Sequence, residues 1–355
     1  MTAFNFDMTK RIEYIDAMRG FTMILVVVAH VIFFSYHGID GFNWGRFFKL
    51  FRMPLFFFIS GYIMYKASRI WSGEVTWDFL KKKFKVQIIP TIIFLSIFAY
   101  LYHLDFYGNI IHKAKGGYWF TLTLFVYFFI FSTISMLCSR LCRKNGEARS
   151  YIILLILSVG FIFFDTKYVD KFAADHHIAL ICNIAQWRYF IFFVIGVLTR
   201  RYFDRITKLL DNSRFMTIVI VAFVGSLLAW YGKDCNMWWN KLEFFVWGLL
   251  GIIIVFSFFR KHESSFTNNT YLGKTLQYIG RRTLDIYLIH YFLVPRNLQM
   301  LGDFFKENSN PTIELFVTLI ISLIVIGLCL LVSNVIRLSP TLAYWLFGQK
   351  REQER

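Results

Sequence analysis

Two ionisable residues lie inside the first strongly apolar stretch of the chain, and their types suit acid–base chemistry. Arg19 and His30 are eleven residues apart within the stretch 17–36. In an α-helix this spacing returns to within about 20° of the same face and separates the residues by about 16 Å along the axis. Asp16 lies on that face too, three residues before Arg19. The spacing therefore predicts one helical stripe that carries a carboxylate, a guanidinium and an imidazole.

The chemistry open to this stripe is proton transfer beside a bound acyl donor such as a thioester. An imidazole titrates near neutral pH, so His30 can remove a hydroxyl proton as a general base. Arg19 can hold a phosphate or a carbonyl of the donor from the cytoplasmic side. A purely structural interpretation stays open, in which Arg19 reaches the interface at its helix end and His30 bonds a neighbouring helix. Because ionisable groups inside a membrane span are expensive, both are nevertheless functional candidates.

The elements that position this stripe are membrane helices. Of the 355 residues, 57% are hydrophobic, 20% are aromatic and only 17% are charged, which is too little charge to cover a soluble domain of this length. A span needs about 20 mostly apolar residues. We expect an all-α bundle of about ten spans, with approximate limits 17–36, 47–65, 87–103, 118–137, 150–164, 186–199, 215–231, 242–259, 283–300 and 313–337.

The net charge of +17 follows the loops. Basic residues gather in every second loop, at about 66–85, 140–149, 200–214 and 260–282, and in the tail after 337. This alternation is typical of the positive-inside rule, so we expect both termini in the cytoplasm. The basic residues therefore indicate membrane topology and contact with anionic lipid, and not binding to nucleic acid. We expect a multi-pass protein of the plasma (inner) membrane.

The chain reads as one membrane domain over 1–355, with short cytoplasmic tails of about 1–15 and 340–355. Loops are short, and no internal repeat is evident. The five cysteines are scattered and lack the spacing of a metal framework or a disulfide scaffold. We expect no metal site and no permanently bound cofactor. The oligomeric state is left open.

Five short motifs resemble the acyltransferase-3 family of membrane acyltransferases. Residues 15–20 (IDAMRG) with His30 resemble its R-x10-H signature, and 53–62 (MPLFFFISGY) look like its MPLFFFxSGY stretch. Residues 118–120 (YWF), 189–196 (YFIFFVIG) and 284–290 (LDIYLIH) are similar to its WF, FFxxG and IYLxH elements. The motifs occur in the expected order over nearly the whole chain.

The resemblance implies a ten-helix bundle that passes an acyl group, often acetyl, from cytoplasmic acyl-CoA to an extracytoplasmic hydroxyl. It implies His30 as general base and Arg19 as its partner at the donor side, and we group Asp16 with them. Many members carry an RxxR pair after the second helix. Here that position has Lys66 and Arg69, so one bidentate guanidinium is replaced by a point charge.

Several further residues are candidates with a structural alternative beside each. Ser60 could line an acyl tunnel or allow close helix packing, and Trp119 could contact the donor or anchor the interface. Tyr287 and His290 lie one turn apart, where His290 could orient His30 or the acceptor, or only bond another helix. Arg188 could meet an acidic acceptor or extend to the interface. The basic run 81–85 is most simply a topology and lipid-surface signal.

The sequence therefore predicts a membrane O-acyltransferase that uses acyl-CoA, with acetyl-CoA the expected co-substrate, and a saccharide or lipid-linked glycan as acceptor. The alternative is a multi-pass transporter or flippase of a sugar or lipid-linked glycan. The two differ because only the enzyme releases CoA. Direct transfer and an acyl-histidine intermediate both stay open, and the acyl chain length is not fixed.

Overall fold

Helices make up the described part of the chain in the computed structural model. That part comprises residues 12–36, 38, 43–112, 114–141, 145–163, 181–230, 237–308 and 310–349, and it contains no β-strand. The helices of the first half are α1 (Glu13–Ser35), α2 (Asn43–Lys49), α3 (Arg52–Met64), α4 (Gly73–Lys83), the π-helix η1 (Phe84–Ile88), α5 (Ile89–Leu101), α6 (Phe106–Ile111), η2 (Lys115–Gly117), α7 (Trp119–Leu141) and α8 (Gly146–Phe163). Those that follow are η3 (Ile184–Tyr189), α11 (Phe190–Arg201), α12 (Phe203–Leu210), α13 (Ser213–Trp230), α14 (Met237–Lys261), η4 (Glu263–Phe266), α15 (Tyr271–Arg281), α16 (Thr283–Leu293), α17 (Gln299–Glu307), α18 (Pro311–Ile336) and α19 (Pro340–Phe347).

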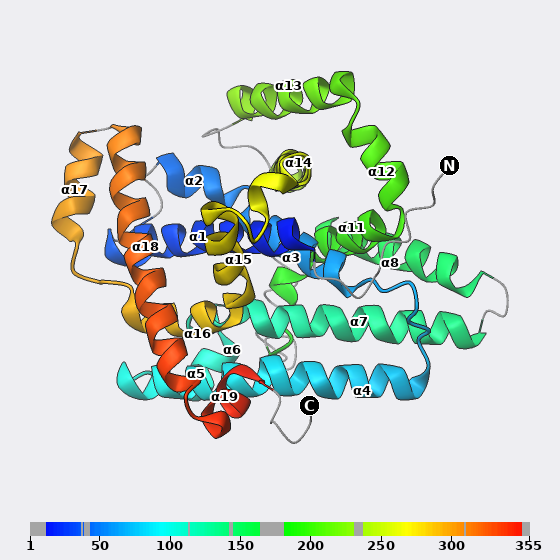
Figure 1. Ribbon diagram of the computed structural model, residues 1–355, viewed down its shortest axis with the longest axis horizontal. Coiled ribbons are helices and arrows are strands. Elements are labelled where there is room, and N and C mark those ends of the chain that lie inside the picture. Colours follow the sequence, from blue (N-terminus) through cyan, green and yellow to red (C-terminus); the bar gives the residue numbers. More distant parts are fainter. Residues whose placement is uncertain are drawn as a thin grey trace.

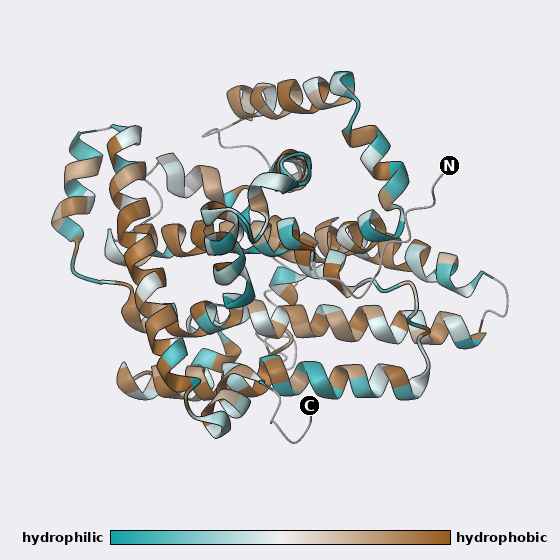
Figure 2. Ribbon diagram, viewed as in Figure 1, coloured by the Kyte–Doolittle hydropathy of each residue, from teal (hydrophilic) through white to brown (hydrophobic). Residues whose placement is uncertain are grey.

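The fold is that of a multi-pass membrane protein. In the described residues, six helices are long and apolar enough to cross a bilayer, or seven if the bent pair α12 and α13 forms one span. Figure 2 shows largely apolar ribbon along α7 and α18, in contrast to the hydrophilic α15. The all-helical membrane architecture is thus confirmed. The count of about ten spans and the cytoplasmic location of both ends stay predictions.

Parts of the topology argument fall on residues outside the described ranges. They include the end segments 1–11 and 350–355 and several outer-loop lysines: Lys113, Lys167, Lys171 and Lys233.

Helix α1 forms the centre of the bundle and is mostly buried, whereas most of α18 is not. It packs against α3, α14, α15, α16 and α18 (Figure 1). Methionine and β-branched residues such as Met23 and Val27 fill its contacts with these neighbours. Since it is surrounded by helices, its polar stripe faces protein and not lipid.

Two pairs of glycines allow the closest helix contacts. A Cβ on Gly20 of α1 would lie 2.0 Å from the carbonyl oxygen of Leu276, and one on Gly280 of α15 would lie 1.9 Å from that of Asp16. The pair Gly61 and Gly196 joins α3 and α11 in the same reciprocal way. Only glycine permits such backbone approach. The first pair brings the Arg19 end of α1 against the junction of α15 and α16.

The structure corrects two of the expected segments. The stretch 283–300 is not one helix, because α16 ends at Leu293 and Val294 is extended, with φ −66° and ψ 120°, directly before Pro295. A residue before proline is disfavoured in the helical region. The third span begins at Gly73, well before 87, and runs continuously to Leu101. The basic run 81–85 therefore lies within a helix and not in a loop.

Candidate functional site

A cavity of about 320 Å³ lies among α1, α3, α7, α16 and the junction of α4 with η1. As the helical spacing predicts, Arg19, Val26 and His30 line it together. Aromatic side chains from α3 and α7 make up much of the remaining wall. None of the described residues that line it is a carboxylate. The cavity thus joins an imidazole to cationic groups in largely apolar surroundings.

His30 is hydrogen-bonded to His290, and the network defines which nitrogen is free. The carbonyl oxygen of Ile286 can only accept, so Nδ1 of His290 donates to it over 2.9 Å. In neutral His290 the other nitrogen, Nε2, is then an acceptor, and Nδ1 of His30 donates to it over 2.8 Å. This tautomer leaves Nε2 of His30 with an available lone pair on a ring that lines the cavity.

The helix that carries His290 is fixed against the start of α7 by tyrosines. Tyr287 and Tyr291 each donate a hydrogen bond to the carbonyl oxygen of Gly117 over 2.8 Å. Tyr287 also accepts from the backbone N–H of Phe120 over 3.1 Å. Because its hydroxyl is already bonded on both sides, Tyr287 sets the position of α16, although it also lines the cavity.

At the other end of the stripe, Arg19 contacts Thr283 and Asp16. Its Nη2 donates to the hydroxyl of Thr283 over 2.9 Å, and that hydroxyl donates to the carbonyl oxygen of Gly280 over 2.7 Å. Its Nη1 lies 3.5 Å from Asp16 Oδ1. Asp16 does not line the cavity. Asp16 therefore orients the Arg19 guanidinium from outside the cavity, while the guanidinium itself borders the cavity.

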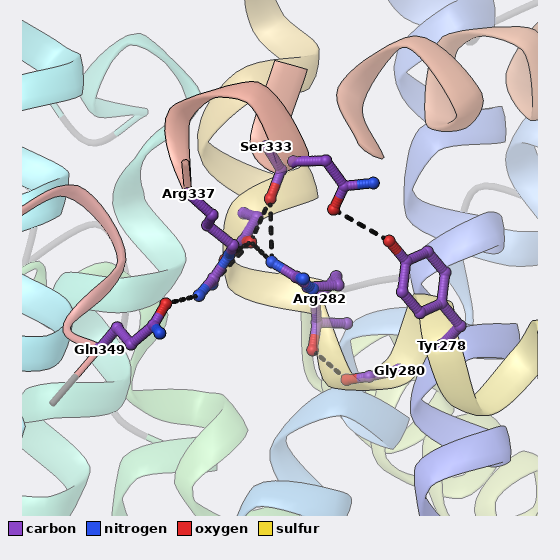
Figure 3. Close-up of polar contacts among 9 residues, drawn as sticks. Tyr278, Gly280, Arg282, Ser333, Arg337 and Gln349 are labelled. Atoms are coloured by element: carbon purple, nitrogen blue, oxygen red, sulfur yellow. Dashed lines mark hydrogen bonds and ion pairs between the residues drawn. The ribbon is translucent and has the colours of Figure 1, made fainter. Parts of the chain in front are cut away.

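A buried ion cluster fixes the beginning of α16 to the end of α18. Asp285, only 2% exposed, accepts from Arg337 in a bidentate arrangement, from Nη2 to Oδ1 and from Nε to Oδ2, each over 2.9 Å. It also accepts from Arg282 over 3.2 Å. Ser333 donates to the same carboxylate over 2.5 Å. Figure 3 shows Arg282, Arg337 and Ser333 converging from these two helices. Asp285 directly precedes Ile286, whose carbonyl accepts the hydrogen bond from His290. The cluster therefore fixes the turn of α16 that orients the histidine pair.

Sequence reasoning missed several cavity residues, among them the cations Arg52 and Lys83 and the amide Gln87. Arg52 is the first residue of α3, and Lys83 and Gln87 lie at and just after the junction of α4 with η1. Lys83 Nζ also lies 4.3 Å from the centroid of the Phe128 ring. The basic run 81–85 was expected to be a topology and lipid-surface signal, and for Lys83 the surface part of that expectation is wrong. A π-helix at this point is a feature that recurs at functional sites.

Lys66 and Arg69 line a second, smaller cavity of about 170 Å³. They form one turn, in which the backbone N–H of Arg69 donates to the carbonyl of Lys66 over 3.0 Å. The Arg69 guanidinium lies about 5 Å from the rings of Trp71 and Phe79, and partial burial lowers its pKa. Lys83 of the main cavity is near enough to Lys66 and Arg69 for their like charges to repel it.

The remaining predicted residues are divided between lining and packing positions. Ser60 lines the main cavity, and its hydroxyl donates to the carbonyl of Phe56 over 2.9 Å. Trp119 lines the same cavity and not the one that holds Lys66 and Arg69. Arg188 lies outside the lining of the main cavity, with its guanidinium 4.9 Å from the Phe244 ring.

A comparison with known protein families identifies the family of the chain. A family model described as an acyltransferase domain matches residues 12–333, which is nearly the whole chain. The matched range includes α1, both cavities and the histidine of α16. No curated protein and no solved structure matches the chain. The extent of the family match shows that the chain belongs to the acyltransferase-3 family of membrane acyltransferases.

Proposed function

We propose that the protein transfers an acyl group, typically acetyl, from cytoplasmic acyl-CoA to a hydroxyl of a saccharide or lipid-linked glycan in the plasma (inner) membrane. The observation that carries this proposal is the His30–His290 pair, whose tautomer leaves a lone pair on the cavity-lining His30 ring. A general base needs such a lone pair within reach of the hydroxyl it activates. Family membership supports acyl transfer as the class of reaction.

In the proposed reaction, Nε2 of His30 removes the proton of the acceptor hydroxyl as its oxygen attacks the thioester carbonyl carbon. The C–O bond forms and the C–S bond then breaks. CoA leaves as a thiolate, which receives the proton that His30 took from the acceptor hydroxyl. During the step His30 is an imidazolium, which donates a stronger hydrogen bond to Nε2 of His290. His290 thus orients the base and spreads its positive charge.

The cationic residues support the donor side of this proposal. CoA carries several phosphates, and guanidinium and ammonium groups bind phosphate. Arg19 and Lys83 line the main cavity, and Lys66 and Arg69 line the second one. We assign the CoA phosphates to this group of four cations. The acyl end then extends along α1 toward His30, about 16 Å further on.

The proposal is tested with inside-out membrane vesicles that contain the protein and receive acetyl-labelled acetyl-CoA. Label entering the glycan and lipid fractions is measured together with CoA release. His30→Ala should lower both by at least about 10²-fold at equal protein level, because the general base is removed. His262→Ala serves as the matched control, since His262 is an exposed histidine whose ring is bonded to the carbonyl of Phe258, outside the cavity lining.

Equal labelling by the wild type and His30→Ala would overturn this mechanism. Movement of a labelled sugar across the membrane without CoA release would instead favour the transporter. Mass spectrometry of the labelled fraction then identifies the acceptor and the acyl group.

A further inference from the structure

Arg52 carries an unpaired buried nitrogen in the cavity of His30. Its Nη1 is buried and has no hydrogen-bond partner among the described residues, and its side chain lines the cavity. No carboxylate belongs to the described lining, so the positive charge is not neutralised there. Leaving a buried charged donor unpaired is costly, and such costs are concentrated at functional sites.

Several other arginines in the described part of the chain have carboxylate partners. Arg337 and Arg282 bind Asp285, while Arg201 and Arg260 pair with Glu147 and Asp211 through one nitrogen although their Nε is unpaired. No ion pair joins Arg52 to any described acid. Arg188 likewise has an unpaired buried nitrogen, but of the two only Arg52 lines the main cavity. Its missing partner is therefore expected to be an anion that enters the cavity.

The position of Arg52 separates this anion from the phosphates of the donor. Arg52 and Lys66 lie at opposite ends of α3, and 13 helical residues span about 20 Å. Arg52 instead interacts electrostatically with His30 and with Tyr291, which both line the main cavity. Its charge thus acts where the proposed base works, away from the second cavity.

We propose that Arg52 binds the thioester carbonyl oxygen and stabilises the negative charge that this oxygen gains during transfer. This inference rests on the proposed acyl transfer. When the acceptor oxygen bonds to the carbonyl carbon, the carbonyl electron pair moves onto the oxygen, and the Arg52 guanidinium donates to that oxyanion. The pair returns as the C–S bond breaks, and the leaving thiolate receives the proton held by His30. Such preorganised donors strengthen in the transition state more than in the ground state.

The test compares Arg52→Met, Arg52→Lys and Lys49→Met in the vesicle assay with labelled acetyl-CoA. Arg52→Met should lower transfer by at least about 10²-fold, whereas the dissociation constant for acetyl-CoA changes less than about threefold. Transfer by Arg52→Lys should be about tenfold faster than transfer by Arg52→Met, because lysine keeps the charge but lacks the planar guanidinium. Lys49→Met removes an exposed cation one turn earlier and should match the wild type.

A second readout separates catalysis from folding. Because Arg52→Met removes an unpaired buried charge, its Tm should equal or exceed that of the wild type. A lowered Tm that accounts for the lost transfer would show that Arg52 is structural. Weaker acetyl-CoA binding in proportion to the lost transfer would show that it binds donor phosphate.

Hydrolysis of acetyl-CoA by the purified protein shows whether Arg52 binds the oxyanion or an anionic group of the acceptor. Hydrolysis should fall in parallel with transfer, since both reactions pass through the same oxyanion. Lost transfer with retained hydrolysis, or transfer within threefold of the wild type, would overturn the assignment. If His30→Ala transfers as well as the wild type, the acyl-transfer mechanism itself fails, and the role of Arg52 fails with it.

Discussion

Nε2 of His290 lies 2.8 Å from Nδ1 of His30, and a backbone carbonyl on the far side of His290 orients both rings. The order of proton donors is set by Ile286 O, which can only accept. His290 is completely buried, whereas His30 borders the cavity. The buried ring thus controls the tautomer of the accessible one, as second partners of histidine commonly do.

The first prediction concerns this control. His290→Phe keeps an aromatic ring but removes the acceptor for His30 Nδ1–H, so the lone pair on Nε2 is no longer fixed. Labelled acetyl transfer should fall by about 10²-fold. His290→Gln offers an oxygen acceptor and should retain more transfer. Tyr278→Phe, which removes the hydrogen bond to Asn334, is the matched control and should stay within a fewfold of the wild type. Wild-type transfer by His290→Phe would contradict the proposed role of His290 in orienting His30.

The second prediction concerns the ion cluster at the base of α16. Asp285→Asn keeps the shape of the side chain but leaves Arg282 and Arg337 without a counter-charge. Breaking a buried ion pair in this way should lower the free energy of unfolding by about 3–5 kcal/mol. Ser333→Ala removes one hydrogen bond to the same carboxylate and should cost about 1 kcal/mol. Thermal unfolding in detergent checks the order of the two variants. A loss for Asp285→Asn no larger than that for Ser333→Ala would show that the cluster is not stabilising.

Sequence periodicity could predict the face of α1 because that geometry is internal to one helix. It placed Arg19 and His30 on one side, and both line the cavity. Their hydrogen-bond partners Thr283 and His290 are tertiary and lie more than 250 positions away. Arg52 was overlooked for the same reason. The sequence shows an arginine beside an apolar run. Whether its nitrogen has a partner depends on which distant helices pack around it, and the sequence does not show this.

Two boundary errors had local signals. Ser72 accepts a hydrogen bond from the N–H of Val75 over 3.2 Å, which is the geometry of a helix N-cap. A serine followed by Glu74 could have predicted the early start of α4, and with it the placement of Lys83 in a helix. Pro295 likewise predicts a break near Val294. Apolar content obscured both signals, since a hydropathy window measures composition and not caps.

The third prediction concerns the glycine contact that brings α1 to α15. Gly20→Ala places a Cβ 2.0 Å from the carbonyl oxygen of Leu276, so the helices must separate. Such overpacking should cost about 1–3 kcal/mol. It should also weaken acetyl transfer, because Arg19 follows the displaced helix away from Thr283. Gly327→Ala is the control: apart from its own helical turn, no described residue comes within 4 Å of the added Cβ, so the substitution should be neutral or stabilising by up to about 1 kcal/mol. Equal Tm values for the two variants would exclude tight packing at Gly20.

The fourth prediction concerns the pH dependence of stability. Lys115 lies in η2, outside the candidate spans, and is completely buried, with Nζ donating to the carbonyl of Ile110 over 2.5 Å. Burial lowers the pKa of Lys115 from 10.5 to about 8. Between these values the unfolded chain holds a proton that the folded chain has released, so stability rises with pH. Below pH 8 both states are charged, and the desolvation cost is fully present.

Lys115→Met removes this titration and should be more stable than the wild type near pH 7. Raising the pH from 8 to 10.5 should reduce its advantage by up to about 3 kcal/mol, since each pKa unit corresponds to about 1.4 kcal/mol. Thermal unfolding of both proteins in one detergent across this range measures the difference. Exposed Lys49→Met should show no such change. A constant difference between Lys115→Met and the wild type would mean that Lys115 stays charged when folded, so that its bond to Ile110 outweighs its burial.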